Sequence, residues 1–260
     1  MRKMLPILIC LLCVGASDAL AQTKSSSASN DFKGVVYDRE ITGDFKWHTN
    51  GWSVAVNKAR IKTYYKTTFY QLELGEIKHP KEYSQRLESR FLDSSPNSFV
   101  YGKQNSLFVL RANKGAKRYF TEKASQKGVA VGMSYAIGAA LGILKPYYLE
   151  LRQFRDNSGK FTLASEKYSE ENAVRFLDIN QSIYGASSFW QGISELRVVP
   201  GIHGKIALHL DWGAFDEYVK AFEVGLMADI FPRKMPLMIT QENRPFFINF
   251  YLNVQFGKRS

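Results

Sequence analysis

The sequence predicts an all-β protein, an eight-stranded antiparallel β-barrel that crosses a membrane. Three observations predict this fold. Apolar and polar residues alternate with a period of two in segment after segment, as in strands with one wet and one apolar face. The first residues have the features of an N-terminal signal peptide. After them no apolar run approaches the roughly 20 residues of a membrane helix, so a membrane-spanning chain must be a closed barrel.

Residues 1–21 are predicted to be the signal peptide. Arg2 and Lys3 precede a short apolar core at 4–15 and an A-x-A cleavage site at 19–21. An N-terminal membrane anchor is the alternative, but this core is too short to span a bilayer comfortably. Both cysteines of the chain fall inside the leader, so the exported chain is expected to carry no thiol and no disulfide.

The rest of the chain divides into a flexible polar segment and one barrel domain. Residues 22–33 are rich in serine and are expected to be mobile. Residues 34–260 carry the alternating pattern at the length a tilted spanning strand requires. The eight expected strands lie at about 34–44, 51–60, 66–77, 99–111, 128–151, 202–212, 217–230 and 246–256.

The fifth expected strand separates residues by size as well as by polarity. Its outward face is bulky, and its inward face consists of alanine, glycine and serine. Small inward residues leave room for long side chains from neighbouring strands, as in any narrow barrel. The small residues are Ala130, Gly132, Ser134, Ala136, Gly138, Ala140 and Gly142.

Charged residues fall on the inward faces of the third, sixth and seventh expected strands. Because unpaired charges in the interior would be costly, we expect them to pair as a polar network that plugs the lumen. An eight-stranded barrel is filled by side chains, so no open solute pore is expected. The expected network consists of Glu73, Lys205, His209, Asp211, Glu223 and Asp229.

Loop lengths predict an orientation. An even number of strands puts both ends of the barrel domain on one side, which in such barrels is the periplasm, with short turns there and longer loops outside. The short connections are 61–65, 113–127 and 213–216, and the long ones are 78–98, 152–201 and 232–245. Within the longest, residues 169–178 begin like a capping box and are expected to form a short helix.

A secreted soluble β-barrel or sandwich would also alternate, and it is the main competing fold. The membrane barrel is favoured because the bulky faces of the last four strands are nearly free of charge. Aromatic residues also gather toward strand ends, like the interfacial girdles of membrane barrels. These aromatic residues are Tyr147, Tyr148, Trp212, Phe215, Tyr218, Phe231, Phe246 and Phe256.

The formal charge of +11 does not indicate nucleic acid. The basic residues are scattered through turns without a nucleic-acid motif, and export would remove the chain from cytosolic nucleic acid. Basic residues at the rims of a barrel are suited to anionic lipid headgroups or lipopolysaccharide phosphates, while simple solvation of the turns explains them equally well.

The sequence gives little sign of catalysis. The four histidines do not stand in a metal-binding spacing, and no catalytic, cofactor or metal residue is expected. His48-Thr49-Asn50-Gly51 is superficially similar to the His-x-Ser-Asn pattern of outer-membrane lipid A deacylases but lacks its serine. We expect His48 to be a turn residue beside Asn50-Gly51.

The closing strand resembles that of bacterial outer-membrane barrels. Its apolar face ends on an aromatic residue four positions before the end of the sequence, and such residues help the insertion machinery recognise the strand. The resemblance implies this machinery as a partner. The corresponding side chains here are Phe250, Leu252, Val254 and Phe256.

The chain as a whole resembles a family of small outer-membrane barrels from Bacteroidota. The resemblance implies the cell outer membrane and the barrel fold but no established activity. The expected function is therefore a structural, surface-binding or assembly role, with outer-membrane lipid and lipopolysaccharide as partners. An accessory role in a secretion or cell-surface complex is the alternative, and a lipid-modifying enzyme is less favoured. The similar segments are 48–52, 79–82, 101–105, 142–146, 200–201 and 256–259.

Overall fold

The structure is a computed structural model. It describes residues 37–63, 65–86, 97–121, 129–154, 161–179, 182–212 and 217–260. The expected signal peptide and the expected flexible segment lie outside these residues. No helix in the described ranges is long and apolar enough to cross a membrane.

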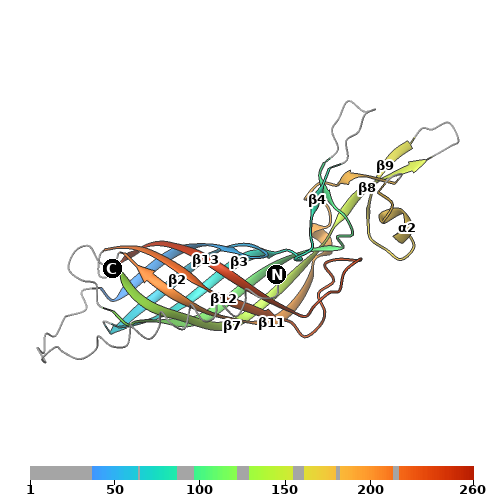
Figure 1. Ribbon diagram of the computed structural model, residues 1–260. Helices are drawn as coiled ribbons and strands as arrows, with labels where there is room; N and C mark the ends of the chain where they lie inside the picture. The colour runs from blue at the N-terminus through green and yellow to red at the C-terminus, as the bar shows by residue number, and fades with distance from the viewer. Residues whose placement is uncertain are drawn as a thin grey trace, which may run out of the picture. The chain divides into compact units, whose positions relative to one another are not determined.

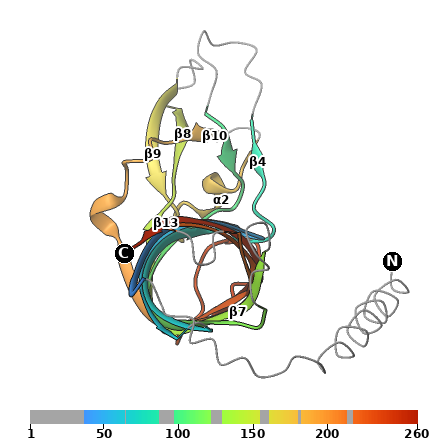
Figure 2. The same ribbon diagram turned by 90° about the vertical axis from the view of Figure 1, so that its left-hand side faces the viewer.

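Eight antiparallel strands close into a barrel, which confirms the predicted fold class (Figures 1 and 2). Neighbouring strands around the barrel follow the order β1-β13-β12-β11-β7-β6-β3-β2. Barrel strands that follow one another along the chain are also neighbours in the sheet, so the barrel is a simple up-and-down meander. The strands are β1 (Arg39–His48), β2 (Gly51–Thr63), β3 (Lys66–Ile77), β6 (Asn105–Tyr119), β7 (Ala130–Pro146), β11 (Arg197–Asp211), β12 (Tyr218–Ile230) and β13 (Phe246–Arg259).

The register of the ladder fixes the tilt of the strands. From Lys258 on β13, a continuous row of paired residues runs once around the barrel and returns to β13 at Ile248, ten residues away (258 − 248). With about 3.3 Å per residue and about 4.8 Å between strands, this offset tilts eight strands by about 40° from the barrel axis. Such a barrel is just wide enough for side chains to fill it.

Several expected strand boundaries were wrong, among them the start of the sixth strand, which lies at Arg197 rather than 202. The first strand begins at Arg39 rather than 34 and continues through His48, so His48 ends a strand instead of lying in a turn. Its pattern is weak because Gly43 stands on the outward face. The fourth runs over 105–119 rather than 99–111, because apolar residues occupy both faces at its start. The fifth ends at Pro146, which cannot donate a ladder hydrogen bond.

Short connections gather at the end of the barrel where β1 begins and β13 ends. The links β2–β3, β6–β7 and β11–β12 are all there, as expected from loop length; residues 213–216 lie outside the described ranges. The opposite end carries the long connections and one tight hairpin, Thr49–Asn50, between β1 and β2. The hairpin requires glycine at position 51, because φ is 149° there and a Cβ would lie 2.1 Å from the carbonyl oxygen of Glu76.

The longest connection folds into a small sheet of its own. Its strands β8 (Tyr148–Phe154), β9 (Phe161–Lys167) and β10 (Ile183–Ala186) pair in the order β10-β8-β9, and β8 follows β7 almost directly. The expected helix is a single turn, α2 (Ala173–Phe176), before which Ser169 and Asn172 exchange side-chain to backbone hydrogen bonds. The apolar core under this sheet consists of Phe99, Leu149, Leu151, Phe176 and Ile183.

Candidate functional site

The wall of the barrel is apolar outside and polar inside. On β13, Leu252 and Phe256 are 45% and 63% exposed on the outer face. Asn253 and Gln255, which alternate with these outward residues along the strand, are fully buried in the lumen. The same alternation runs along the other strands, so the interior of the barrel, rather than its outside, holds the polar side chains.

The lumen at the end where the barrel begins and ends, at Arg39 and Arg259 (called the termini of the barrel below), holds the first group of paired charges. Arg259 donates to Glu40 (Nε–Oε2 2.9 Å) and to Asp211 (2.8 Å). Lys117 donates to the other oxygen of Glu40 at 3.0 Å. Tyr119 donates to Asp211 at 3.1 Å, and its hydroxyl lies 3.3 Å from Nε2 of His209.

The middle of the lumen is organised by two carboxylates and a set of amides. Asp44 accepts hydrogen bonds from the side-chain amides of Asn57, Gln71, Asn253 and Gln255, at 2.7–3.2 Å. Glu223 lies 3.0 Å from Nδ1 of His209 and 3.6 Å from Nζ of Lys205. The amide of Asn253 donates to both carboxylates, and Gln255, which donates to Asp44, accepts from Lys117 and so connects this group to the first.

The lumen farthest from the termini is centred on Arg111. Its guanidinium donates to both carboxylate oxygens of Asp229, at 2.8 Å each, and to Glu73 at 2.6 Å. Asp229 also contacts Nδ1 of His203 at 2.9 Å. Glu73 pairs with Lys46 and accepts from the hydroxyl of Ser53 at 2.8 Å. The bidentate geometry fixes Arg111 from β6 against β12.

The structure places all six residues of the expected network in the lumen. It brings His209 and Lys205 to Glu223, and it leaves Asp211, Asp229 and Glu73 to partners that the sequence reasoning did not single out. Their partners are the cations Arg259, Arg111 and Lys46. Inward alternation along β1, β6 and the end of β13 would have found these three and the other lumen charges that were missed, Glu40, Asp44 and Lys117.

Charges inside the barrel nearly balance. In the ranges that the structure describes, five cations (Lys46, Arg111, Lys117, Lys205 and Arg259) and six carboxylates (Glu40, Asp44, Glu73, Asp211, Glu223 and Asp229) are buried there. The small inward residues of β7 make this packing possible, because Arg111 lies opposite Ala140 and Lys205 lies opposite Ala136. A dense, paired interior of this kind favours a closed lumen.

An apolar plug covers the network at the end away from the termini. The segment after β12 turns into the barrel mouth (Figure 2) and packs its apolar side chains against the inward ends of β3, β6, β7 and β11. Gly142 makes room for it, since a Cβ there would lie 2.8 Å from Phe231. Phe231 is thus buried rather than part of an outer aromatic girdle, and Tyr147 and Tyr148 belong to the loop sheet and its core, which corrects the expectation for these three. Phe215 lies outside the described residues. The plug residues are Phe231, Met235, Leu237, Met238 and Phe247.

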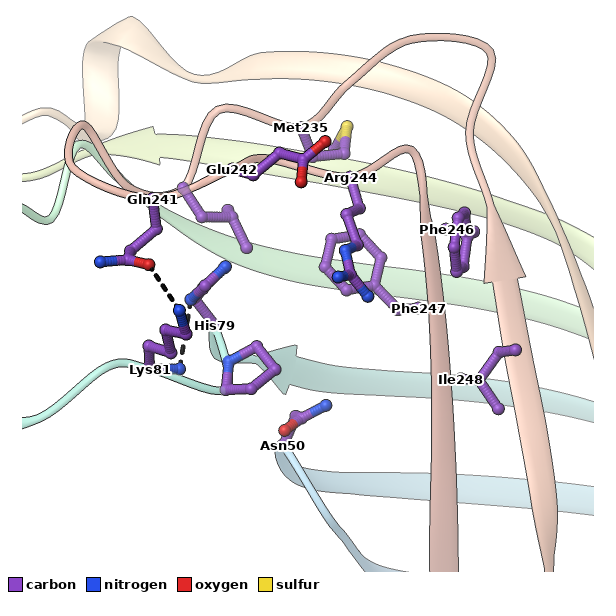
Figure 3. A pocket seen from close by; sticks show the side chains of 12 residues that line it. Asn50, His79, Lys81, Met235, Gln241, Glu242, Arg244, Phe246, Phe247 and Ile248 are labelled. Atoms are coloured by element: carbon purple, nitrogen blue, oxygen red, sulfur yellow. Dashed lines mark hydrogen bonds between the residues drawn. The ribbon is translucent and has the colours of Figure 1, made fainter.

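A cavity of about 430 Å³ opens beside the plug (Figure 3). It lies between the β1–β2 hairpin, the segment after β3 and the segment before β13. Nζ of Lys81 donates to Gln241 at 2.9 Å, and the backbone N–H of Lys81 donates to Nδ1 of His79 at 3.2 Å. The exposed side chains of Arg244 and Glu242 also line the cavity, so its polar wall carries both signs of charge.

In the described part of the chain, no group of three or more His, Cys, Asp or Glu side chains could hold a metal ion. His48 is buried at the end of β1, and its two ring nitrogens have no hydrogen-bond partner among the described residues. What the lumen does chemically is to hold charges in fixed, paired positions.

No protein-family model matches the sequence, and no curated protein matches it. Among solved structures, the crystal structure of Neisserial surface protein A (NspA) is similar at a TM-score of 0.39 and 6% sequence identity. The likeness covers 86% of this chain and 97% of that chain.

Proposed function

We propose that the protein is an integral outer-membrane β-barrel with a closed lumen, which acts through its long loops in a structural, surface-binding or assembly role. Outer-membrane lipid and lipopolysaccharide are the expected surroundings, and barrel-insertion machinery is the expected partner in assembly. Three features support the proposal: the apolar outer wall, the filled lumen and the folded loops at one end.

The outer wall is the observation that carries the proposal. On β13 the outward residues from Phe246 to Phe256 are all apolar, and Lys258 follows them. Ten residues at about 3.3 Å each, tilted by about 40°, cover about 25 Å along the axis, which is the height of the apolar band in membrane barrels. A soluble barrel places its apolar face inside, whereas here the inside is charged.

Fractionation of cells tests the location. The protein should remain with outer membranes after a carbonate wash and should migrate differently on a gel before and after heating. Recovery in the soluble fraction would refute the membrane proposal. Reconstitution in a planar bilayer tests the lumen: no steady conductance is expected, and a stable open channel would contradict a lumen sealed by paired charges.

A second candidate is an accessory role in protein secretion or cell-surface assembly. It is favoured by β9, the last strand of the loop sheet, which pairs with β8 alone among the described strands and exposes Leu163. An open strand edge can accept a strand from another chain. In the register of β8 and β9 the backbone groups of Thr162 and Ala164 face β8, so those of Leu163 face the open edge. Replacing Leu163 by proline should therefore abolish co-purification of a secretion complex while the barrel still folds. Unchanged co-purification would refute the open edge of β9 as the binding site for a partner.

A further inference from the structure

Basic residues surround the outer wall at the end of the barrel where β1 begins and β13 ends. They face outward on six of the eight strands and are exposed on five of these. At the end of an apolar band such residues mark the level of lipid headgroups. They are Arg39, Lys58, Arg60, Lys62, Lys114, Arg118, Lys220 and Lys258, together with the half-buried Lys66.

Lys114 stands well above the others along the barrel axis. It precedes Arg118 by four residues on β6, which places it about 10 Å closer to the middle of the apolar band. Lys58 precedes Arg60 by two residues on β2, so it lies about 5 Å closer than Arg60 to the middle of the apolar band. A cation facing hydrocarbon at such depth is unfavourable unless it reaches the interface or meets an anion.

These two lysines lie at one end of a groove in the outer wall. The groove has a volume of about 580 Å³. The small side chain of Ala112 on β6 forms the floor of the groove. The bulky side chains of Leu72 and Ile137 on the neighbouring strands form its walls. Its lining is therefore almost entirely apolar except at the end nearer the termini.

The polar end of the groove is built around an aromatic ring. Lys58 and Lys114 are the residues paired with Tyr70 on either side of it in the sheet. Nζ of Lys114 lies 5.6 Å from the centre of the Tyr70 ring. Among the described residues no carboxylate lies within ion-pair distance of either lysine, although both are exposed.

We propose that this groove binds an anionic glycerophospholipid from the leaflet at the end of the barrel where β1 begins and β13 ends. Lys58 and Lys114 would hold the phosphate beside Tyr70, and one acyl chain would lie over Ala112 between Leu72 and Ile137. The two lysines supply the charge that a phosphate diester needs, and the apolar lining fits a chain rather than a soluble anion. The inference rests on the proposed membrane location.

Native mass spectrometry of the folded barrel released from mixed micelles tests the site. The probes are phosphatidylglycerol and the zwitterionic phosphatidylcholine with the same acyl chains. Wild type should retain phosphatidylglycerol at least about fivefold more than phosphatidylcholine, the size of effect expected for two charge-assisted contacts. The double variant Lys58→Gln/Lys114→Gln should lose this preference.

Two further variants separate the groove from general surface charge. Lys220→Gln/Lys258→Gln removes two outward cations on the other side of the barrel and should keep the preference. Ala112→Trp fills the groove without changing charge and should reduce retention of both lipids. Equal loss in the two double variants, or full retention in Ala112→Trp, would refute the groove as the site.

The same preparation distinguishes the two proposals. If the wild-type barrel inserts into vesicles and shifts on heating but shows no preference between the lipids, the lipid site is wrong and the membrane barrel stands. If the chain stays outside vesicles of either composition, the proposed location is wrong and the lipid site is refuted with it.

Discussion

Replacing Asp229 by leucine should strongly destabilise the barrel. The carboxylate balances Arg111, and without it Arg111 and Lys46 both face the single carboxylate of Glu73, which leaves one buried positive charge uncompensated. Removing one partner of a buried ion pair typically costs about 3–5 kcal/mol. We expect a decrease of this size in the free energy of unfolding.

A second substitution should recover much of that loss. In the double variant Arg111→Met/Asp229→Leu, Lys46 still pairs with Glu73, so no unpaired charge is left in this layer. Replacing a whole buried pair by apolar groups is often nearly neutral. Urea titration of the purified barrel in micelles, read from the fraction that keeps folded mobility on a gel, measures both variants.

Asp229→Asn is the matched control, because it keeps the shape and some hydrogen bonds while it removes the charge. It should lie between wild type and Asp229→Leu. A free energy of unfolding for Asp229→Leu within about 0.5 kcal/mol of wild type would be usual for a surface site. That result would mean that these charges are solvated and that the lumen is not closed around them. A double variant as unstable as the sum of the two single variants would contradict the pairing itself.

Three other perturbations test the wall, the plug and the loops. Leu252→Arg, near mid-height on the outer face, should disfavour folding into lipid by about 2–4 kcal/mol in vesicle refolding titrations, whereas Leu252→Phe should be close to neutral; equal effects would mean that this face does not meet lipid. Phe231→Ala should lower the free energy of unfolding by about 3 kcal/mol, because it leaves a cavity in the plug. Bilayers that contain this variant should still not conduct ions, because the polar layers of the lumen remain. Ion conduction would mean that the plug, and not the polar network, closes the lumen. In the loops, hydrogen bonds from Lys167 and Tyr148 lower the pKa of Glu195. The hydrogen bond between Lys167 and Glu195 in turn raises the pKa of Lys167. The contact should be complete above the usual pKa of a glutamate and be lost as pH falls through the lowered value. Protection of the amides at 193–197, measured against the intrinsic exchange rate at each pH, should therefore fall in acid in the wild type and not in Glu195→Gln.

Period-two alternation was sufficient to predict the barrel and the direction of most of its side chains. The prediction is strongest on β13 between Phe246 and Phe256, where each outward residue is apolar and, apart from Phe247 in the plug, each inward residue is polar. It fails where that contrast disappears. Leu107 and Val109 point inward because they meet the plug, so the start of β6 has two apolar faces and its boundary shifted by several residues.

Contacts across the lumen could not be predicted in the same way. The inward positions of Asp211 and Asp229 follow from alternation, but the choice of Arg259 and Arg111 as partners depends on the ten-residue offset of the closed sheet. That offset is a property of the whole barrel, and no single segment encodes it. The plug is a similar case, because the segment after β12 has no periodicity that shows whether it turns inward.

Several ion pairs of the lumen join strands that are not neighbours in the sheet. Lys46 on β1 reaches β3, Arg111 on β6 reaches β12, and Lys117 on β6 reaches β1. Ladder hydrogen bonds keep adjacent strands together but do little to stop a cylinder from flattening. These struts cross the cylinder and brace its cross-section, so lateral pressure from the bilayer should leave it round. The loops would then stand on a rigid base, and their positions would not drift with the state of the membrane.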